Sequence, residues 1–450
     1  MERIDLNCLK AEIGALTPAR RIGYVSGVYG GVVEIEGLSD IGRLGDQVSL
    51  KTADGAISGE VLRMTASHLS ILPDHDPVGL SIGDQAILDG QVALAPHDGW
   101  IGRVIDPFGK PLDGRPLMRG PAARTLRAAP PEPTRRRPLG DRLETGLAAF
   151  NTMLPIVAGQ RIGLFAGSGV GKSTLLSQLA RGLQADVVVI ALIGERGREV
   201  GEFIHKVLGP EGMKRSVVIA ATSDRSPLVR RRCAWAAMSV AEHFRDQGNN
   251  VLLLADSITR FAEAHREIAL ACGENASLRG YPASTSQAIM SLCERAGPGE
   301  EGQGDITAVL SVLVAGSDMD EPIADITRGV LDGHIVLDRE IAERGRFPAI
   351  DLLRSVSRSL PHAATPEENQ IIEEFRKLLG TYQRSEMMIK AGLYAAGSDP
   401  ELDRAIRLWP QLDAFLAEHE DTDTRASFYR LAQIMGRMAL FPQSDDEVDA

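Results

Sequence analysis

The stretch RIGLFAGSGVGKSTLLSQLARGL, residues 161–183, decides the fold. An apolar run is followed by a glycine-rich loop and then by a helical pattern of leucines. The glycines allow the backbone to curl so that successive N–H groups point at one phosphate, and the helix N-terminus adds partial positive charge. This strand–loop–helix order is the context that a P-loop requires. The sequence therefore predicts a nucleotide-binding loop made of Ala166, Gly167, Ser168, Gly169, Val170, Gly171, Lys172, Ser173 and Thr174.

Two side chains of this loop have the chemistry to hold a nucleoside triphosphate. Lys172 is expected to reach the β- and γ-phosphates, and the Ser173 hydroxyl is expected to ligate Mg²⁺. The first position is Ala166, where the strict pattern has glycine, so the match is to the relaxed form of the motif. ATP as substrate, with Mg²⁺ as its cofactor, follows from these residues.

Four further apolar runs lie outward from this loop, at residues 186–193, 216–222, 249–256 and 305–314. Runs that are apolar throughout are typical of strands covered on both faces, as in a parallel sheet. Helical patterns separate them. The middle of the chain is therefore predicted to be an α/β domain with a doubly wound, mainly parallel sheet.

Carboxylates stand where two of these runs end. Asp256 ends the run 249–256, where an acid can hold a Mg²⁺-bound water. Glu195 follows the run 186–193 in the segment IGERGREVGEF, and a carboxylate there can polarise an attacking water. The charged residues around Glu195 are also open to a plainer interpretation, a solvated loop with internal ion pairs.

The texture of the chain divides it into five parts. Residues 1–20 are predicted to form a short helix, which either docks a partner or is a packed terminal helix. Short β-runs in 21–91 indicate a small antiparallel barrel. The nucleotide-binding domain is assigned to 92–350, a C-terminal helical domain to 351–442, and an acidic tail to 443–450. Within the range 92–350, the Pro/Arg-rich stretch 121–138 is predicted to be a solvated connector.

Composition excludes several classes of protein. The net charge of −12 opposes binding to nucleic acid, which favours a basic excess. The four cysteines include no CxxC pair and the chain starts without a secretory leader, which predicts a reducing cytoplasmic environment. The sequence contains no uncharged apolar window long enough to cross a membrane.

At this point the residues resemble a known family, the rotary-type ATPases with a RecA-like core. The resemblance rests on AGSGVGKST, GERGREV, LLLADSITRFAEAHREIA, RGYPAS and DGHIVLDREIAERGRFPAIDLLRSVSR, and it covers nearly the whole chain. The set is most similar to the flagellar and type III secretion export ATPases. Gly197 in GERGREV fits this export branch, because the catalytic subunit of the proton-pumping synthase typically has threonine there. The stretch ETGLAAFN, residues 144–151, departs from the family pattern.

The resemblance implies roles for individual residues. Lys172 and Ser173 take the phosphate and Mg²⁺ roles, and Glu195 activates the attacking water. Asp256 and Glu199 are expected to bind the metal through water molecules. Arg196 and Arg260 are expected to be pocket arginines that neutralise phosphate charge. Phe347 matches the aromatic position that stacks on adenine.

The resemblance also implies an assembly. Arg358, in LLRSVSRSLP, matches the arginine finger that reaches into a neighbouring subunit's site. Because Glu195 and Arg358 are on the same chain, a ring of identical copies could complete every active site, and we expect a homohexamer. The expected partners are a stator-like regulatory protein at the N-terminal helix, a central stalk protein, an export gate and substrate–chaperone complexes. The protein is expected at the cytoplasmic face of an export apparatus and is at most peripheral to the inner membrane.

Flagellar protein export, with the chain releasing substrates from chaperones, is the favoured function. The alternatives are a non-flagellar type III secretion ATPase, an ATP synthase subunit, an RNA-translocating hexameric ATPase and a non-hydrolysing nucleotide-binding subunit. The RNA reading needs aromatic platforms and basic loops in the barrel, but residues 21–91 contain only Tyr24 and Tyr29 as aromatics. Lys172, Glu195 and Asp256 together oppose the non-hydrolysing subunit.

Overall fold

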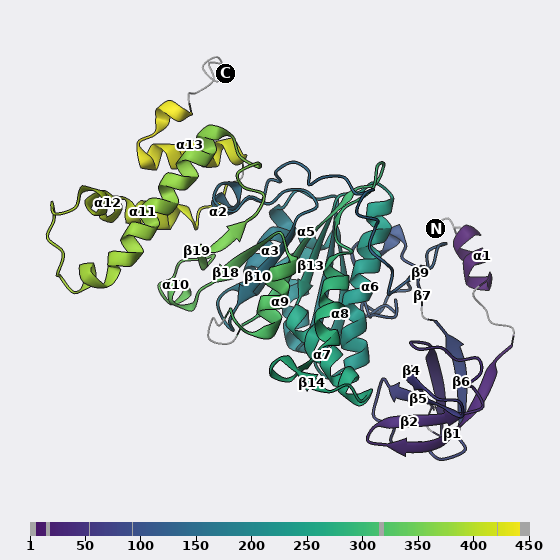
Figure 1. Ribbon diagram of the computed structural model, residues 1–450. Helices are drawn as coiled ribbons and strands as arrows, with labels where there is room; N and C mark the ends of the chain where they lie inside the picture. Colours follow the sequence, from purple (N-terminus) through teal and green to yellow (C-terminus); the bar gives the residue numbers. More distant parts are fainter. Residues whose placement is uncertain are drawn as a thin grey trace.

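A nine-stranded sheet forms the centre of the computed structural model, which describes residues 6–14, 19–53, 55–91, 93–314, 319–420 and 422–441 (Figure 1). Its strands follow the order β19-β18-β10-β17-β13-β11-β12-β8, and β16 pairs with β17. All neighbours are parallel except the pairs made by β19 and β16. The strands are β8 (Arg103–Ile105), β10 (Arg161–Ala166), β11 (Val187–Glu195), β12 (Ser216–Thr222), β13 (Val251–Asp256), β16 (Gly297–Pro298), β17 (Asp305–Leu313), β18 (Gly333–Leu337) and β19 (Ile350–Ser357).

Both faces of this sheet are covered, as the apolar runs predict. Along β11, Val188, Ile190 and Leu192 belong to one hydrophobic core, while the alternate residues Val189 and Ala191 belong to another. The first core is shared with α3 and the C-terminal helices, and the second with α6 to α9. The helices of this domain are α2 (Ala148–Asn151), α3 (Lys172–Gly182), α4 (Gly197–Glu202), α5 (Gly209–Met213), α6 (Pro227–Asp246), α7 (Ile258–Ala271), α8 (Ser284–Cys293), α9 (Pro322–Val330) and α10 (Arg339–Glu343).

The N-terminal part of the chain is a closed antiparallel barrel, which confirms the prediction. Its six strands follow one another around the barrel in the order β1-β2-β5-β4-β3-β6 and enclose a separate apolar core. Closure removes the exposed edges that a small open sheet would leave. The strands are β1 (Arg21–Tyr29), β2 (Val32–Glu36), β3 (Gln47–Thr52), β4 (Gly55–Met64), β5 (His68–Pro73) and β6 (Gln85–Gly90).

A cluster of charged side chains around a buried carboxylate connects the barrel to the central domain. Glu60 of β4 accepts hydrogen bonds from Arg127 at 2.8 Å and from Arg231 of α6 at 3.2 Å. The two guanidinium groups also lie over the ring of Trp235, at 4.5 and 4.9 Å from its centroid. A buried carboxylate needs such partners to offset its lost hydration.

The predicted domain boundary at residue 350 differs from the structure. Residues 350–357 are not helical but form β19, which pairs antiparallel with β18 at the end of the sheet. Helices begin only at Pro366, where Thr365 and Glu368 form a capping box. The C-terminal helices are α11 (Pro366–Lys390), α12 (Pro400–Phe415) and α13 (Thr424–Met435), and the predicted break before Pro400 is confirmed.

The basic connector is largely exposed, as predicted, but its arginines also have partners in the central domain. Three consecutive arginines at 135–137 all contact the central domain, although they remain partly exposed. Oppositely charged side chains and free carbonyl groups at the end of the sheet supply their partners. The contacts are Arg135–Glu300 at 2.6 Å, Arg136 to the Ala296 carbonyl at 3.2 Å, and Arg137–Asp305 at 2.6 Å.

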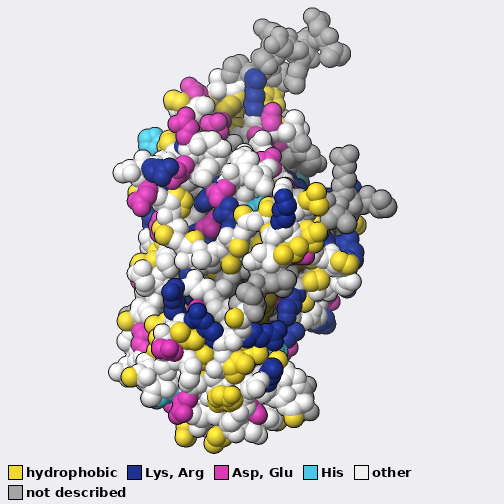
Figure 2. Space-filling view, turned by 90° about the vertical axis from the view of Figure 1, so that its right-hand side faces the viewer, with side chains coloured by type: hydrophobic (Ala, Val, Ile, Leu, Met, Phe, Trp, Pro, Cys, Tyr) yellow, Lys and Arg dark blue, Asp and Glu magenta, His cyan; other side chains and the backbone are white. Residues whose placement is uncertain are grey.

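The N-terminal helix forms as predicted, as α1 (Leu6–Gly14), at the barrel end of the molecule (Figure 1). Its apolar residues Leu6, Leu9 and Ile13 are exposed, whereas Cys8 is buried. Figure 2, which looks at this end, shows hydrophobic side chains interspersed with Lys and Arg. Leu16 and the predicted acidic tail 443–450 lie outside the described residues. None of the helices in the described ranges has both the length and the apolar composition that crossing a bilayer requires.

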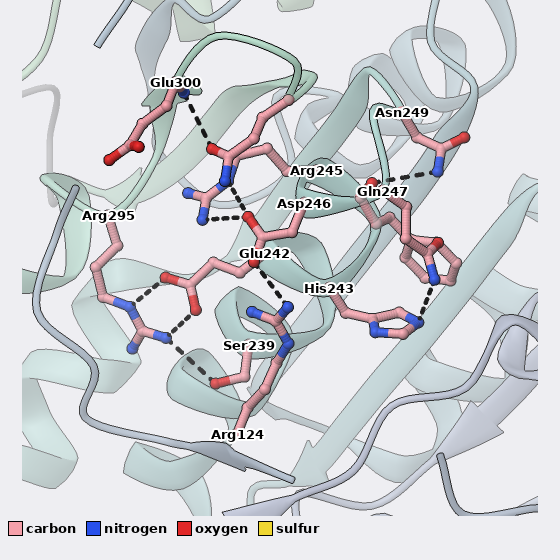
Figure 3. A network of polar contacts seen from close by, with 12 residues as sticks. Arg124, Ser239, Glu242, His243, Arg245, Asp246, Gln247, Asn249, Arg295 and Glu300 are labelled. Atoms are coloured by element: carbon pink, nitrogen blue, oxygen red, sulfur yellow. Dashed lines mark hydrogen bonds and ion pairs between the residues drawn. The ribbon is translucent and has the colours of Figure 1, made fainter. Parts of the chain in front are cut away.

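A buried ion pair joins α6 to the end of α8 (Figure 3). Arg295 donates to both carboxylate oxygens of Glu242, at 2.8 and 2.7 Å, and both side chains are at most 5% exposed. Arg295 also donates to the Ser239 hydroxyl and to the Leu126 carbonyl, so its guanidinium holds the connector against the helix.

We expect the Glu242→Ala variant to lose about 3–5 kcal/mol of unfolding free energy, because it leaves the Arg295 charge buried without a partner. The measurement is the urea midpoint by circular dichroism. The control is Asp325→Ala, which removes an exposed pair with Arg328 and should change stability by less than about 0.5 kcal/mol. Equal midpoints for the two variants would contradict a structural role for the buried pair.

Candidate active site

The predicted P-loop forms the turn between β10 and α3. Gly169 and Gly171 have φ angles of +78° and +86°, which a residue with a side chain rarely adopts. Gly171 is the N-cap of α3, so the helix begins at Lys172 and directs its first N–H groups into the loop. The local geometry is that of an anion-binding helix N-terminus.

The P-loop lysine lies against the carboxylate that ends β13. The Lys172 ammonium group forms an ion pair and a hydrogen bond with Asp256 Oδ1. The same oxygen accepts a hydrogen bond from the Ser311 hydroxyl of β17 at 2.7 Å. Ser311 was not predicted as a site residue, although a lone serine within the apolar run 305–314 was a visible signal. These three side chains join the P-loop to the neighbouring strands.

Glu195 lies at the end of β11, beside β13, so the two predicted carboxylates share one edge of the sheet. Burial raises the pKa of Glu195 to about 7, and the negative charge of Asp256 and a hydrogen bond with Glu199 act in the same direction. The positive charge of Lys172 opposes this shift. A carboxyl group with a pKa near 7 is poised to gain or lose a proton under physiological conditions.

The charged residues after Glu195 are less buried than it is. Arg196 pairs with Glu199 at 2.7 Å, and this hydrogen bond lowers the pKa of Glu199. Glu199 is therefore charged near neutral pH while Glu195 sits at its titration point. The guanidinium of Arg196 is largely exposed.

Arg260, on the first turn of α7, lies next to the Glu195 segment. Its side-chain carbons are 3.3 Å from the position that a Cβ on Gly194 would occupy. Gly194 also has a φ angle of +69°, so this close approach requires glycine. The Arg260 guanidinium pairs with Glu263 at 2.8 Å.

Phe347 lies beside the P-loop, next to Gly171. Its ring is 3.1 Å from the position that a Cβ on Gly171 would occupy, and half of the side chain is exposed. An aromatic ring that is both exposed and next to the phosphate loop can stack on a planar base.

Arg358 does not lie with the other predicted residues. It follows β19, and Ser357 pairs with Gly333 at the start of β18, whereas Ala166 pairs with Leu337 at the end of β18. Gly333 and Leu337 are four residues apart along β18, which corresponds to about 13 Å of strand. Arg358 is exposed, and its guanidinium has no ion pair within the part of the chain that the structure describes. It therefore lies at the opposite edge of the sheet from the P-loop.

The donors near the P-loop suit Mg²⁺. Within the described ranges no three His, Cys, Asp or Glu side chains gather closely enough to hold a metal by themselves. Mg²⁺ is commonly held by a few protein oxygens together with substrate phosphate and water, and the Ser173 hydroxyl with the carboxylates of Asp256 and Glu199 would serve in that way. Bound there, Mg²⁺ would neutralise charge on the phosphates.

A RecA-like sheet with a P-loop, an acid at the end of β13 and a titratable carboxyl at the end of β11 defines the class of P-loop ATPases. Comparison with known proteins narrows this class. Residues 146–357 match the nucleotide-binding domain of the ATP synthase alpha/beta family, and residues 364–434 match the T3SS EscN ATPase C-terminal domain.

Individual relatives cover nearly the whole chain. The flagellum-specific ATP synthase of Agrobacterium fabrum is 44% identical over 409 residues, which is 90% of this chain and 86% of that protein. The type 3 secretion system ATPase of Xanthomonas euvesicatoria is 40% identical over 416 residues, 92% of this chain and 93% of that protein.

Among solved structures, the assembled ATPase EscN in complex with its central stalk EscO, from the type III secretion system of enteropathogenic E. coli, is similar with a TM-score of 0.84. It is 37% identical, and the match covers 92% of this chain and 100% of that chain. The chain therefore belongs to the family of flagellum-specific ATP synthases and type III secretion ATPases.

The raised pKa of Glu195 predicts that activity depends on pH. A base must be unprotonated, and a carboxyl with a pKa of about 7 becomes protonated as the pH falls through that value. We therefore expect kcat/KM for ATP to fall about tenfold per pH unit below about pH 7. The Glu195→Gln variant should lose at least about a hundredfold in rate and should not show this acidic limb.

Initial rates at saturating and at low ATP, measured across this pH range, check the expectation. An acidic limb of the same pKa in the residual activity of Glu195→Gln would assign the titration to another group. A wild-type profile that is flat through neutrality would contradict the role of Glu195 as the base.

Proposed function

We propose that the protein hydrolyses Mg²⁺-bound ATP to energise the export of flagellar proteins through a type III secretion apparatus, and that it belongs to the translocase class of enzymes. One observation carries the proposal: Glu195 and Arg358, the base and the finger of one reaction, lie at opposite edges of the same sheet. A single chain cannot bring both to one phosphate. Neighbouring identical copies in a ring can do so, which supports a homohexamer.

The chain's own residues then divide the work of hydrolysis. The P-loop backbone and Lys172 bind the phosphates, and Arg196 and Arg260 supply further positive charge beside them. Glu195 takes the proton of the water that attacks the γ-phosphorus, while the bond from that phosphorus to the ADP oxygen breaks. Arg358 of the neighbouring copy neutralises the charge that develops as this bond breaks.

Phe347 is assigned to the adenine ring on the basis of its half-exposed position against Gly171. Asp256 and Glu199 are assigned to the metal through water molecules, because both carboxylates interact with Glu195 and no cluster of three such side chains is present among the described residues to hold the ion directly. These assignments rest on position and family resemblance.

The partners follow from the family and from exposed surfaces. A solved relative is an assembled ATPase in complex with its central stalk, which supports a stalk protein for this chain as well. The exposed Met387, in the last turn of α11, and Leu393, in the turn that follows, give such a stalk or a substrate–chaperone complex an apolar contact. The exposed apolar residues of α1 suit a stator-like regulatory protein. An export gate, and docking at the cytoplasmic face of the inner membrane, complete this proposal.

The second candidate is export through a non-flagellar type III secretion system. The observation that favours it is the 40% identity to the Xanthomonas protein, which is only slightly below the 44% identity to the flagellar relative. The motifs of the active site are common to both. We prefer the flagellar function because most of the similar relatives are named flagellum-specific ATP synthases.

We expect the Arg358→Ala and Glu195→Gln variants each to be nearly inactive. The ATPase rate of Arg358→Ala should fall by about a thousandfold. In an equal mixture, random rings would combine an intact base with an intact neighbouring finger at about one site in four. Specific ATPase activity of the mixture should therefore rise to about a quarter of the wild-type value.

The measurement is ATPase activity against protein concentration for the wild type, each variant and the mixture. Wild-type specific activity should rise with concentration as rings assemble. Activity that is independent of concentration, with no recovery on mixing, would show that each chain completes its own site and that Arg358 is not the finger.

We expect deletion of the gene in its source bacterium to abolish swimming and to remove flagellar proteins from the culture medium. The wild-type gene should restore both. A Met387→Ser/Leu393→Ser double variant should keep at least about half of the ATPase activity, because both side chains are exposed, yet restore export poorly.

Secreted proteins and swimming are scored together in these strains. Normal swimming in the deletion strain with loss of other secreted proteins would favour the non-flagellar alternative. Full restoration by the double variant would exclude the turn between α11 and α12 as the contact that export needs.

A further inference from the structure

The segment 344–350 connects the P-loop to the C-terminal helices. Phe347 contacts the P-loop at Gly171, whereas its neighbour Arg346 turns inward and is only 8% exposed. The Arg346 guanidinium donates to the Pro348 carbonyl at 2.9 Å and to the Ile350 carbonyl at 2.7 Å. These two hydrogen bonds close the backbone around Phe347 and fix the direction in which the ring projects.

One carboxylate from a different part of the chain balances the charge of this arginine. Asp413, on α12, has its Oδ1 atom 3.0 Å from Arg346 Nε. Burial lowers the pKa of Arg346, and the negative charge of Asp413 acts most strongly against that shift, with smaller effects from Asp351 and Asp338. Helix α12 thus supplies the nearest and largest compensating charge for the buried guanidinium.

A second ion pair between the same segment and the helices is weaker. Arg344 lies 3.5 Å from Glu386 of α11, and its side chain is far more exposed than that of Arg346. Exposed pairs at this separation contribute little. The buried Arg346–Asp413 pair is therefore the main electrostatic link from the C-terminal helices to the loop that carries Phe347.

We propose that Arg346 is a positioning residue, through which the placement of α12 sets the affinity of the site for the base of ATP. The inference rests on the proposed role of Phe347 as the base-stacking side chain. When Asp413 stays within ion-pair distance, Arg346 remains buried and holds Phe347 beside the P-loop. When α12 moves away, the unpaired guanidinium turns toward water and releases the two carbonyls, so the ring loses its fixed direction.

The test separates the base from the phosphates of the ligand. The Asp413→Asn variant removes the counter-ion at a side chain that is 28% exposed, so the fold should tolerate it. We expect its Kd for ATP, measured by binding, to rise about tenfold, with kcat changed by less than about twofold. The Kd for inorganic tripolyphosphate, which has no base, should stay the same because the P-loop is not altered.

Two variants serve as controls. Glu418→Gln removes a carboxylate of similar exposure from the same helical domain, where it pairs with Arg430 at 3.5 Å and does not contact residues 344–350. It should bind ATP like the wild type. Asp413→Glu keeps the charge and should restore most of the ATP affinity.

The results have distinct meanings. Equal ATP affinity for Asp413→Asn and Glu418→Gln would overturn the inference. So would a parallel loss of tripolyphosphate binding, which indicates general damage to the site. A wild-type protein that binds ATP with the expected contrast between variants but does not hydrolyse it would support the inference and count against the proposed function alone.

Discussion

The ion pair between Lys172 and Asp256 is the interaction on which the site depends. It joins the P-loop to β13, and Ser311 secures Asp256 from β17, so three neighbouring elements of the sheet meet at one carboxylate. The same negative charge contributes to the raised pKa of Glu195. One buried acid thus holds Lys172 in place and contributes to the raised pKa of Glu195. The parallel sheet makes this possible, because its strands deliver their carboxyl ends to a single edge.

Local signals account for what could be predicted from the sequence. The P-loop is encoded by glycines that adopt positive φ angles at 169 and 171, and the buried strands are encoded by runs that are mainly rather than wholly apolar, as Ser311 shows. Both kinds of signal lie within a few residues of the structure they specify. The closed barrel and the break before Pro400 were predicted for the same reason, since turn residues mark the ends of their elements.

Contacts between distant residues account for most of what could not be predicted. Strand β19 alternates buried and exposed residues because one face of this end strand packs against α11. Because it contains polar residues, its sequence could not be told apart from the helical sequence that follows. The sequence around the partly exposed arginines at 135–137 does not indicate that Glu300 and Asp305 will pair with them. Likewise, nothing near Arg346 in the sequence indicates that Asp413 will lie beside it.

The geometry of the sheet links catalysis to assembly and to the C-terminal helices. Strands β18 and β19 run between the two edges: their P-loop end carries the segment with Arg346 and Phe347, and the other end leads to Arg358. The two strands are hydrogen-bonded to each other from one edge to the other, so they can carry a displacement between the edges. A shift of the helices that contact Arg346 would therefore also change the direction of Arg358, which is exposed and follows the same strand pair at the opposite edge. In a ring, nucleotide affinity in one subunit and the supply of the finger to the next would then be two consequences of one displacement.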